Sequence, residues 1–158
     1  MSFQSSVNLY PAAAVAGDRA SQNPTVYMPF NYKAGSAAVK VGGFVWNDST
    51  NADEVVAAGS GAPLGFVERE LNKVNYNLTS EGTLTLSEGS NLAVAVKGDF
   101  YVVADGTVTV GMKAYASLTT GAVTFDDAGE TKSGYIETSF KALTAGASGD
   151  LIVMSNWA

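Results

Sequence analysis

The chain has 158 residues, of which 46% are hydrophobic and only 15% are charged, and its net charge is −6. This length fits one domain, and the acidic balance argues against a nucleic-acid partner, because phosphate binding needs clustered Lys and Arg. The chain contains no Cys and no His, which excludes disulfides and Cys-based metal sites. No run approaches the roughly 18 consecutive apolar residues of a membrane span, so no membrane partner is expected.

The first segment, residues 1–32, has few strand signals and is interrupted by Pro11, Pro24 and Pro29. Its first 30 residues hold only two charges, Asp18 and Arg19. This composition predicts an extended N-terminal arm over residues 1–32, lying outside a β-rich body over residues 33–158.

The first half of the body contains two clear strand candidates. Val39–Trp46 alternates around a Gly pair, which is typical of a bulge or bend, and Leu64–Arg69 follows Pro63. A third run, Thr83–Leu86, alternates Thr and Leu as a half-buried strand does. The stretch Asn47–Pro63 is polar and long for a plain connector, which predicts a functional or mobile loop.

The second half alternates short β-prone runs with turn residues. Turn signals at Lys97-Gly98-Asp99 and Thr119-Thr120-Gly121 predict two hairpins. The predicted strands are Leu92–Val96, Phe100–Ala104, Thr107–Val110, Lys113–Leu118, Ala122–Phe125, Tyr135–Leu143 and Leu151–Met154. Helix periodicity is nearly absent. The fold class is therefore all-β: a single compact domain of short antiparallel strands, with sandwich and barrel both left open.

The residues that most often carry catalysis are missing. Without His or Cys, the chain lacks the commonest general base and the best nucleophile. Glu68 and Glu70 form one carboxylate pair, but Arg69 lies between them and no aromatic cluster surrounds them, so we interpret them as solvated charges. Asp48–Glu54 offers oxygen ligands but lacks the Gly of a cation loop's sharp turn. We predict no catalytic residues, no metal site, no cofactor and no enzymatic activity.

Three aromatic residues, Tyr27, Phe30 and Tyr32, alternate loosely near the end of the predicted arm. They support two interpretations. They could form a contact patch for an oligomer or a capsid, or they could be buried where the arm joins the body.

Several segments, in collinear order from residue 3 to about residue 125, resemble one family: the structural cement proteins, or head decoration proteins, of tailed bacteriophages. One departure is Arg19, where the family more often carries an apolar residue, and the last 30 residues match less clearly. The segments that carry the resemblance are Phe3-Gln4, Val7–Ala12, Ala14–Asp18, Val41–Trp46, Gly65–Glu70, Gly98–Val102, Gly111–Ala116 and Gly121–Phe125.

The resemblance implies a protein that binds the outside of an assembled phage head and locks neighbouring capsid subunits together. It implies the major capsid protein as a partner, a homo-oligomer that is often a trimer, and a place on the outer capsid surface of the virion after synthesis in the host cytoplasm. The residues agree with such a role, because a neutral arm can lay its backbone along a foreign surface. The predicted capsid-binding residues are Phe3, Val7, Leu9, Tyr10, Pro11, Val15, Asp18 and Arg19.

Two other functions stay open. A different phage surface module, such as a fibre or a carbohydrate-binding head, would use Trp46 or Tyr76 to stack on a sugar. A depolymerase would use Glu68 or Asp126 as a catalytic carboxylate.

Overall fold

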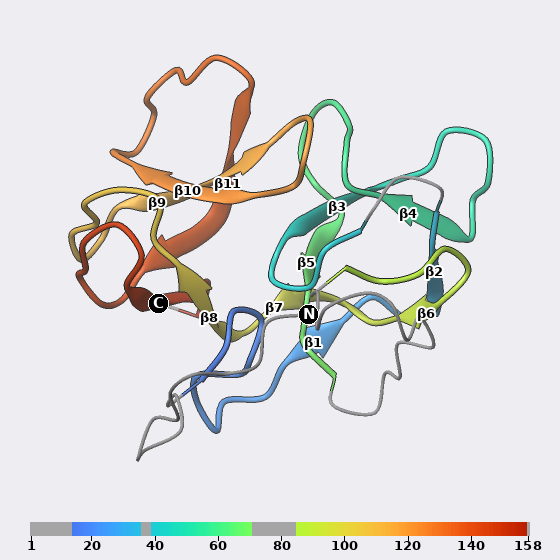
Figure 1. Ribbon diagram of the computed structural model, residues 1–158, viewed down its shortest axis with the longest axis horizontal. Helices are drawn as coiled ribbons and strands as arrows, with labels where there is room; N and C mark the ends of the chain where they lie inside the picture. Colours follow the sequence, from blue (N-terminus) through green and yellow to red (C-terminus); the bar gives the residue numbers. More distant parts are fainter. Residues whose placement is uncertain (1–13, 36–38, 71–84, 158) are drawn as a thin grey trace, which may run out of the picture.

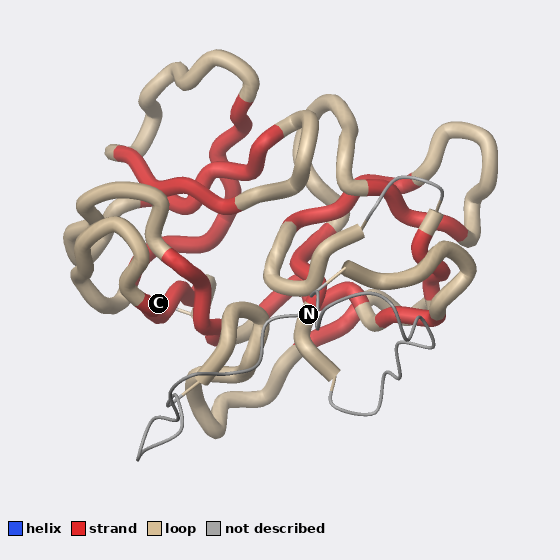
Figure 2. The backbone as a smooth tube through the Cα atoms, in the orientation of Figure 1, coloured by secondary structure: helices blue, strands red, loops and turns tan. Residues whose placement is uncertain are grey.

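The structure is a computed structural model that describes residues 14–35, 39–70 and 85–157. In these residues, all the regular secondary structure consists of short β-strands. Loops connect these strands over much of the chain's length (Figures 1 and 2). The strands are β1 (Val26–Tyr27), β2 (Tyr32–Ala34), β3 (Phe44–Asn47), β4 (Glu54–Val56), β5 (Gly65–Val67), β6 (Asn91–Leu92), β7 (Val94–Lys97), β8 (Asp99–Val103), β9 (Lys113–Ser117), β10 (Val123–Asp126), β11 (Tyr135–Ala142) and β12 (Leu151–Ser155).

The strands form two sheets. One has seven strands in the order β1-β7-β5-β3-β4-β2-β6, and the other has five in the order β10-β9-β11-β12-β8. All the pairings are antiparallel except that of β2 with β4, which is parallel. In Figure 1 the five-stranded sheet and the β2, β4 and β6 end of the other sheet lie at opposite ends of the molecule. The all-β prediction is confirmed.

The central strands of the seven-stranded sheet, β3 and β5, are buried on both faces. Because successive side chains of a strand alternate between faces, Phe44 and Trp46 of β3 face the five-stranded sheet, whereas Val45 faces a second core. Phe66 and Val67 of β5 divide in the same way. Burial on both sides favours continuous apolar runs over polar alternation, which explains why β3 and β5 are so hydrophobic.

Aromatic rings from the two sheets meet in the core between them. The Phe66 and Phe100 ring centroids lie 4.8 Å apart, and those of Phe44 and Phe140 lie 5.7 Å apart in an edge-to-face arrangement. Such pairs add to the stabilisation that apolar burial gives, by about 0.5–1.5 kcal/mol each. The two sheets therefore pack face to face, as in a sandwich, rather than closing into one barrel.

The second half of the chain forms most of its predicted strands. β9 and β10 make the predicted hairpin around Gly121, with Ala116 opposite Val123 and Lys113 opposite Asp126. β11 turns the predicted face inward, with Thr138, Phe140 and Ala142 buried. Thr107–Val110, by contrast, forms only an isolated bridge from Val108 to Gly146.

The predicted hairpin at Lys97-Gly98-Asp99 is wrong. β7 pairs with β1 and β5, while β8 pairs with β12 in the other sheet. The chain crosses between the sheets at Gly98, where an added Cβ would lie 2.7 Å from the Phe100 ring. The turn residues mark a real change of direction, but the two strands bond to different partners.

Other predictions for the first half also need correction. Asn47–Pro63 is not wholly a loop, because it contains β4. Strand β1 and the first residue of β2 lie in the segment predicted as an extended arm. Of Thr83–Leu86, residues 83 and 84 lie outside the described residues, and Thr85 makes a single bridge to Lys40.

Candidate interaction surface

The segment of residues 14–27, here called the strap, crosses the edges of both sheets. The Gly17 N–H donates to Tyr101 O at 2.8 Å, and the Tyr101 N–H donates to Asp18 O at 2.9 Å, both on edge strand β8. The Arg69 N–H, just after β5, donates to Gly17 O at 2.9 Å. Further along, β1 pairs with β7 of the seven-stranded sheet. The strap therefore ties the two sheets together, and Figure 1 shows it in blue below β8 and β1.

Gly17 is required at the point where the strap meets the body. Its φ is +93°, in the region that favours glycine. An added Cβ would lie 2.8 Å from Val41 Cγ1 and 3.1 Å from the backbone N of Gly42. The strap can approach the body this closely only because residue 17 has no side chain.

Two crossed ion pairs fasten the strap to the chain after β5. Arg19 Nε lies 2.8 Å from Glu68 Oε1, and Arg69 Nη1 lies 2.9 Å from Asp18 Oδ1. Tyr27 closes the cluster, since its hydroxyl donates to Glu68 and accepts from Arg19. Glu68 is only 8% exposed, so its charge needs these partners.

The surroundings raise the pKa of both partners of Glu68, Tyr27 and Arg19. Burial and the hydrogen bond to the Glu68 carboxylate raise the pKa of the Tyr27 hydroxyl. Burial works against the charge on Arg19, but the hydrogen bond and charge of Glu68 outweigh it, and the pKa of Arg19 rises. Tyr27 therefore stays a neutral donor and Arg19 a permanent cation in this cluster.

A second polar contact holds the middle of the strap. Ser21 Oγ donates to Asp99 Oδ2 at 2.5 Å, and Asn23 Nδ2 donates to the same oxygen at 2.7 Å. Burial raises the pKa of Asp99, but hydrogen bonds from Ser155, Ser21 and Asn23 together outweigh it, and the pKa lies below its usual value. At neutral pH the Asp99 carboxylate is thus an ionised acceptor for the strap.

The predicted site residues fall into different surroundings. Asp18, Arg19 and Tyr27 meet in the strap cluster. Val15 and Phe30 are exposed, by 37% and 50%. Tyr32 is buried in the second core, which matches the second of its two interpretations. Phe3, Val7, Leu9, Tyr10 and Pro11 lie outside the described residues.

Glu68 is the contact of the strap that the sequence interpretation missed. We predicted a solvated charge there, and this is wrong, because the side chain is buried against Arg19 and Tyr27. One signal was available. Asp18-Arg19 and Glu68-Arg69 are both neighbouring pairs of opposite charge, and each acid pairs with the arginine of the other segment.

The Asn47–Pro63 stretch borders a cavity of about 610 Å³ that Trp46 also lines. Trp46 is nevertheless only 5% exposed, and its Nε1 donates to Gly61 O at 2.9 Å. Gly59 lies so close that an added Cβ would be 2.3 Å from Trp46 Cγ. The indole is covered and is not available as a stacking platform for a sugar.

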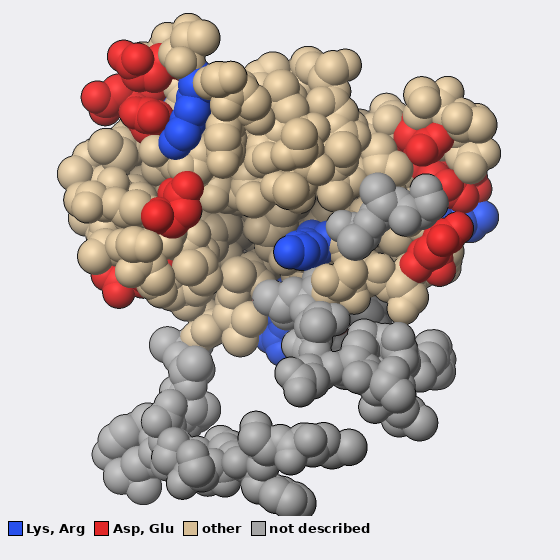
Figure 3. All heavy atoms as spheres, turned by 45° about the horizontal axis from the view of Figure 1, so that its top comes forward, with Lys and Arg blue, Asp and Glu red and all other residues tan. Residues whose placement is uncertain are grey.

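On the face shown in Figure 3, acidic side chains gather at two opposite margins, and basic side chains lie between them. Among the described residues, no group of three acidic side chains is placed to hold a metal ion. Within the same ranges, no helix is long and apolar enough to cross a membrane.

Comparisons with known proteins point to phage capsids. A comparison with curated proteins gave no match. A solved structure described as the capsid of Myoviridae phage XM1 matches with a TM-score of 0.72 and 15% identity, over 99% of this chain and 98% of that chain. The head fiber gp8.5 N base of bacteriophage phi29 matches with a TM-score of 0.50 and 15% identity, over 84% and 93% of the two chains.

At this identity the two structures establish a shared fold and nothing more. The family model of the XM1 gp53 minor capsid protein, however, matches residues 3–156, nearly the whole chain. The chain therefore belongs to the XM1 gp53 minor capsid protein family and is a phage capsid-associated protein.

Proposed function

We propose that the chain is a non-enzymatic cement protein, which binds the outer surface of an assembled phage head and locks neighbouring subunits of the major capsid protein together. The observation that carries this proposal is the strap. Crossed ion pairs and backbone hydrogen bonds fix residues 17–20 on the body. The capsid-family membership supports the same assignment.

The fixed strap gives the preceding residues a firm base. Residues 1–13 contain no charged side chain and supply Phe3, Val7 and Leu9 at odd positions, with Gln4, Ser6 and Asn8 between them. In an extended chain alternate side chains share a face, so these residues would present one apolar face to the shell. We propose residues 1–13 as the capsid-binding arm.

Assembly supplies the affinity that a short arm lacks. Ordering an extended segment costs roughly 1–2 kcal/mol per residue, which offsets much of the contact that each arm makes. A homo-oligomer, proposed as a trimer from the resemblance, would present several arms to a lattice of identical sites. Linked contacts of this kind raise the overall affinity by about 10²–10⁴.

Binding to purified heads tests the proposal. We expect the full chain to decorate heads that lack it and to raise their resistance to heat. The variant without residues 1–13 keeps the strap and its hydrogen bonds, so it should fold normally and lose decoration. Replacing Phe3, Val7 and Leu9 by Ser should have the same effect, whereas replacing Gln4, Ser6 and Asn8 by Ala is the matched control and should bind.

Failure of the full chain to bind any head would contradict the proposal. If the full chain and the shortened chain decorate heads equally, the cement function stands, but residues 1–13 are not the capsid-binding arm. The carbohydrate-binding alternative has no support at Trp46, which is covered, and Tyr76 lies outside the described residues.

A further inference from the structure

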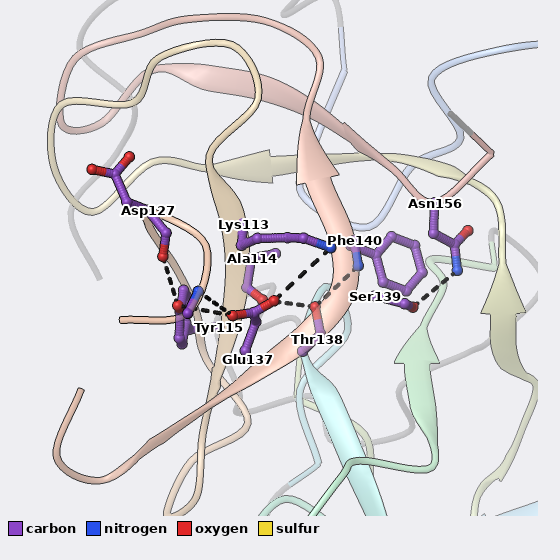
Figure 4. A network of polar contacts seen from close by, with 10 residues as sticks. Lys113, Ala114, Tyr115, Asp127, Glu137, Thr138, Ser139, Phe140 and Asn156 are labelled. Carbon is purple, nitrogen blue, oxygen red and sulfur yellow. Dashed lines mark hydrogen bonds and ion pairs between the residues drawn. The ribbon is translucent and has the colours of Figure 1, made fainter. Parts of the chain in front are cut away.

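The outward face of the five-stranded sheet has two chemically different halves. The half over β9 and the start of β11 is polar and internally bonded (Figure 4). The Tyr115 hydroxyl donates to Asp127 O at 2.7 Å and lies 3.2 Å from Glu137 Oε2. The same carboxylate oxygen accepts from the Gly129 N–H at 2.7 Å, and Lys113 Nζ lies 4.0 Å from Glu137 Oε1. This half satisfies its own polar groups.

The other half is apolar. We define the apolar face as Tyr101, Val103, Leu143, Leu151 and Val153. The strand register makes it continuous: Val103 pairs with Leu151, Tyr101 pairs with Val153, and the Leu143 N–H donates to Val153 O at 2.8 Å. The neighbours of these residues on the strands, Val102, Ile152 and Met154, point the other way into the core.

Part of this face is open to solvent. Val103 is 48% exposed and Leu143 is 39% exposed. Such positions on a sheet normally carry polar side chains when nothing covers them. Charged residues border this face, with Asp99 and Asp105 at the two ends of β8 and Lys141 on β11.

Next to this face, no described residue pairs with the edge of β8 beyond the strap. The backbone of Tyr101 bonds to the strap, whereas the Ala104 N–H donates to Asp150 O on the β12 side. Because backbone groups alternate in direction along an antiparallel strand, the N–H and C=O of Val103 point toward this edge. An extended segment of another protein could pair there and lie beside the apolar face.

The chain itself indicates what lies on the apolar face. The Gly17 N–H of the strap donates to Tyr101 O, which belongs to this face. Residues 1–13 directly precede the strap in the sequence, so their C-terminal end is only a few residues along the chain from this contact. Thirteen extended residues reach about 43 Å, and they are uncharged like the face itself. We propose that the apolar face is a second docking surface for the shell, continuous with the arm; this inference rests on the proposed function.

The substitution Val103→Glu tests the inference, with Asn91→Glu as the control. Asn91 is exposed, also lies on an edge strand, and is on the other sheet, outside the strap. A charge buried without a partner is strongly disfavoured at an interface. We expect Val103→Glu to weaken binding to heads by at least about tenfold, a difference of roughly 1.4 kcal/mol, and Asn91→Glu to bind as the unchanged protein does.

The outcomes separate the possibilities. Circular dichroism and urea unfolding verify that each variant folds, and Leu143→Glu replaces Val103→Glu if the latter does not. Undiminished decoration by the folded variant overturns the inference while leaving the proposed function intact. Sedimentation compares the mass of the free variant with that of the unchanged protein. If the variant has a lower mass because its oligomer dissociates, and head binding is lost only for that reason, the apolar face binds a second copy of the chain instead of the shell. If the unchanged chain binds no head, the proposed function and the inference both fall.

Discussion

Among the few charged residues of this chain, Arg19 and Glu68 form an ion pair that holds the strap on the body. Glu68 lies 49 positions from Arg19, yet the two side chains meet within 2.8 Å. Glu68 is buried and Arg19 is half exposed, with 51% of its side chain accessible. A buried carboxylate is tolerated only with its partners in place, so this pair fixes where the strap lies as much as it stabilises the fold.

The substitution Arg19→Ala should therefore destabilise the protein. It removes one partner of a buried carboxylate, and because Arg19 is partly solvated we expect a loss of about 1–2 kcal/mol in the free energy of unfolding, below the 3–5 kcal/mol of a fully buried pair. Urea unfolding measures the change. Lys33→Ala is the control, since it breaks the exposed pair of Lys33 and Asp53 at 3.0 Å and should have no measurable effect. Equal stabilities of the two variants would contradict a structural role for Arg19.

The strap is an element that has little regular secondary structure of its own. Its order comes from the edges it touches: the N–H and C=O of Tyr101, the N–H of Arg69 and the last residues of β7. An edge strand such as β8 exposes unpaired backbone groups that invite aggregation. The strap covers this edge from Asp99 to Tyr101, and the contact depends on the missing side chain at residue 17.

Gly17→Ala tests that close contact. Two glycines have nearly the same backbone φ, +93° at Gly17 and +96° at Gly111, which would be strained for any other residue. An added Cβ meets Val41 at 2.8 Å in the first case and nothing within 4 Å in the second. Gly111→Ala should cost only the backbone term, about 1–2 kcal/mol, and Gly17→Ala should cost clearly more. Thermal unfolding of the two variants gives the difference, and identical midpoints would show that the strap does not need this contact.

The sequence predicts elements well where their partners are close along the chain. β9 to β12 were all anticipated, because the β9–β10 hairpin is local and β11 is eight residues long with one apolar face. β1, β2 and β4 have only two or three residues each. Their order comes from pairing with distant strands, which no local pattern records. Lys97-Gly98-Asp99 shows the same limit, since a turn signal does not say which sheet the next strand joins.

The candidate site was predictable to a similar extent. Asp18 and Arg19 were singled out as the only charges of a neutral segment, and Tyr27 as one of three spaced aromatics. The convergence of Arg19 and Tyr27 on Glu68, and of Asp18 on Arg69, was not predictable, because it depends on how β5 and the strap are brought together by the whole fold. The apolar face was equally hidden, since Val103, Leu143 and Leu151 come from β8, the residue after β11 and β12.

At the scale of the molecule, the strap joins the five-stranded sheet to the seven-stranded sheet. It contacts β8 of the five-stranded sheet, the residue after β5 and, through β1, strand β7. Core contacts between the sheets, such as that of Phe66 with Phe100, join them from inside. The strap joins them at the edge, next to the surface that we propose meets the shell.

Removing the strap should therefore loosen this edge without unfolding the core. In a chain lacking residues 1–24, the Tyr101 N–H loses its acceptor, Asp18 O, and Asp99 loses Ser21 and Asn23. We expect fast hydrogen exchange at Tyr101, slow exchange at Ile152 in the core, and a lower unfolding midpoint. The chain lacking only residues 1–13 is the control and should exchange at Tyr101 as slowly as the full chain. If both truncations behave alike, the edge is held by the core alone, and the strap is no more than a tether for the residues that precede it.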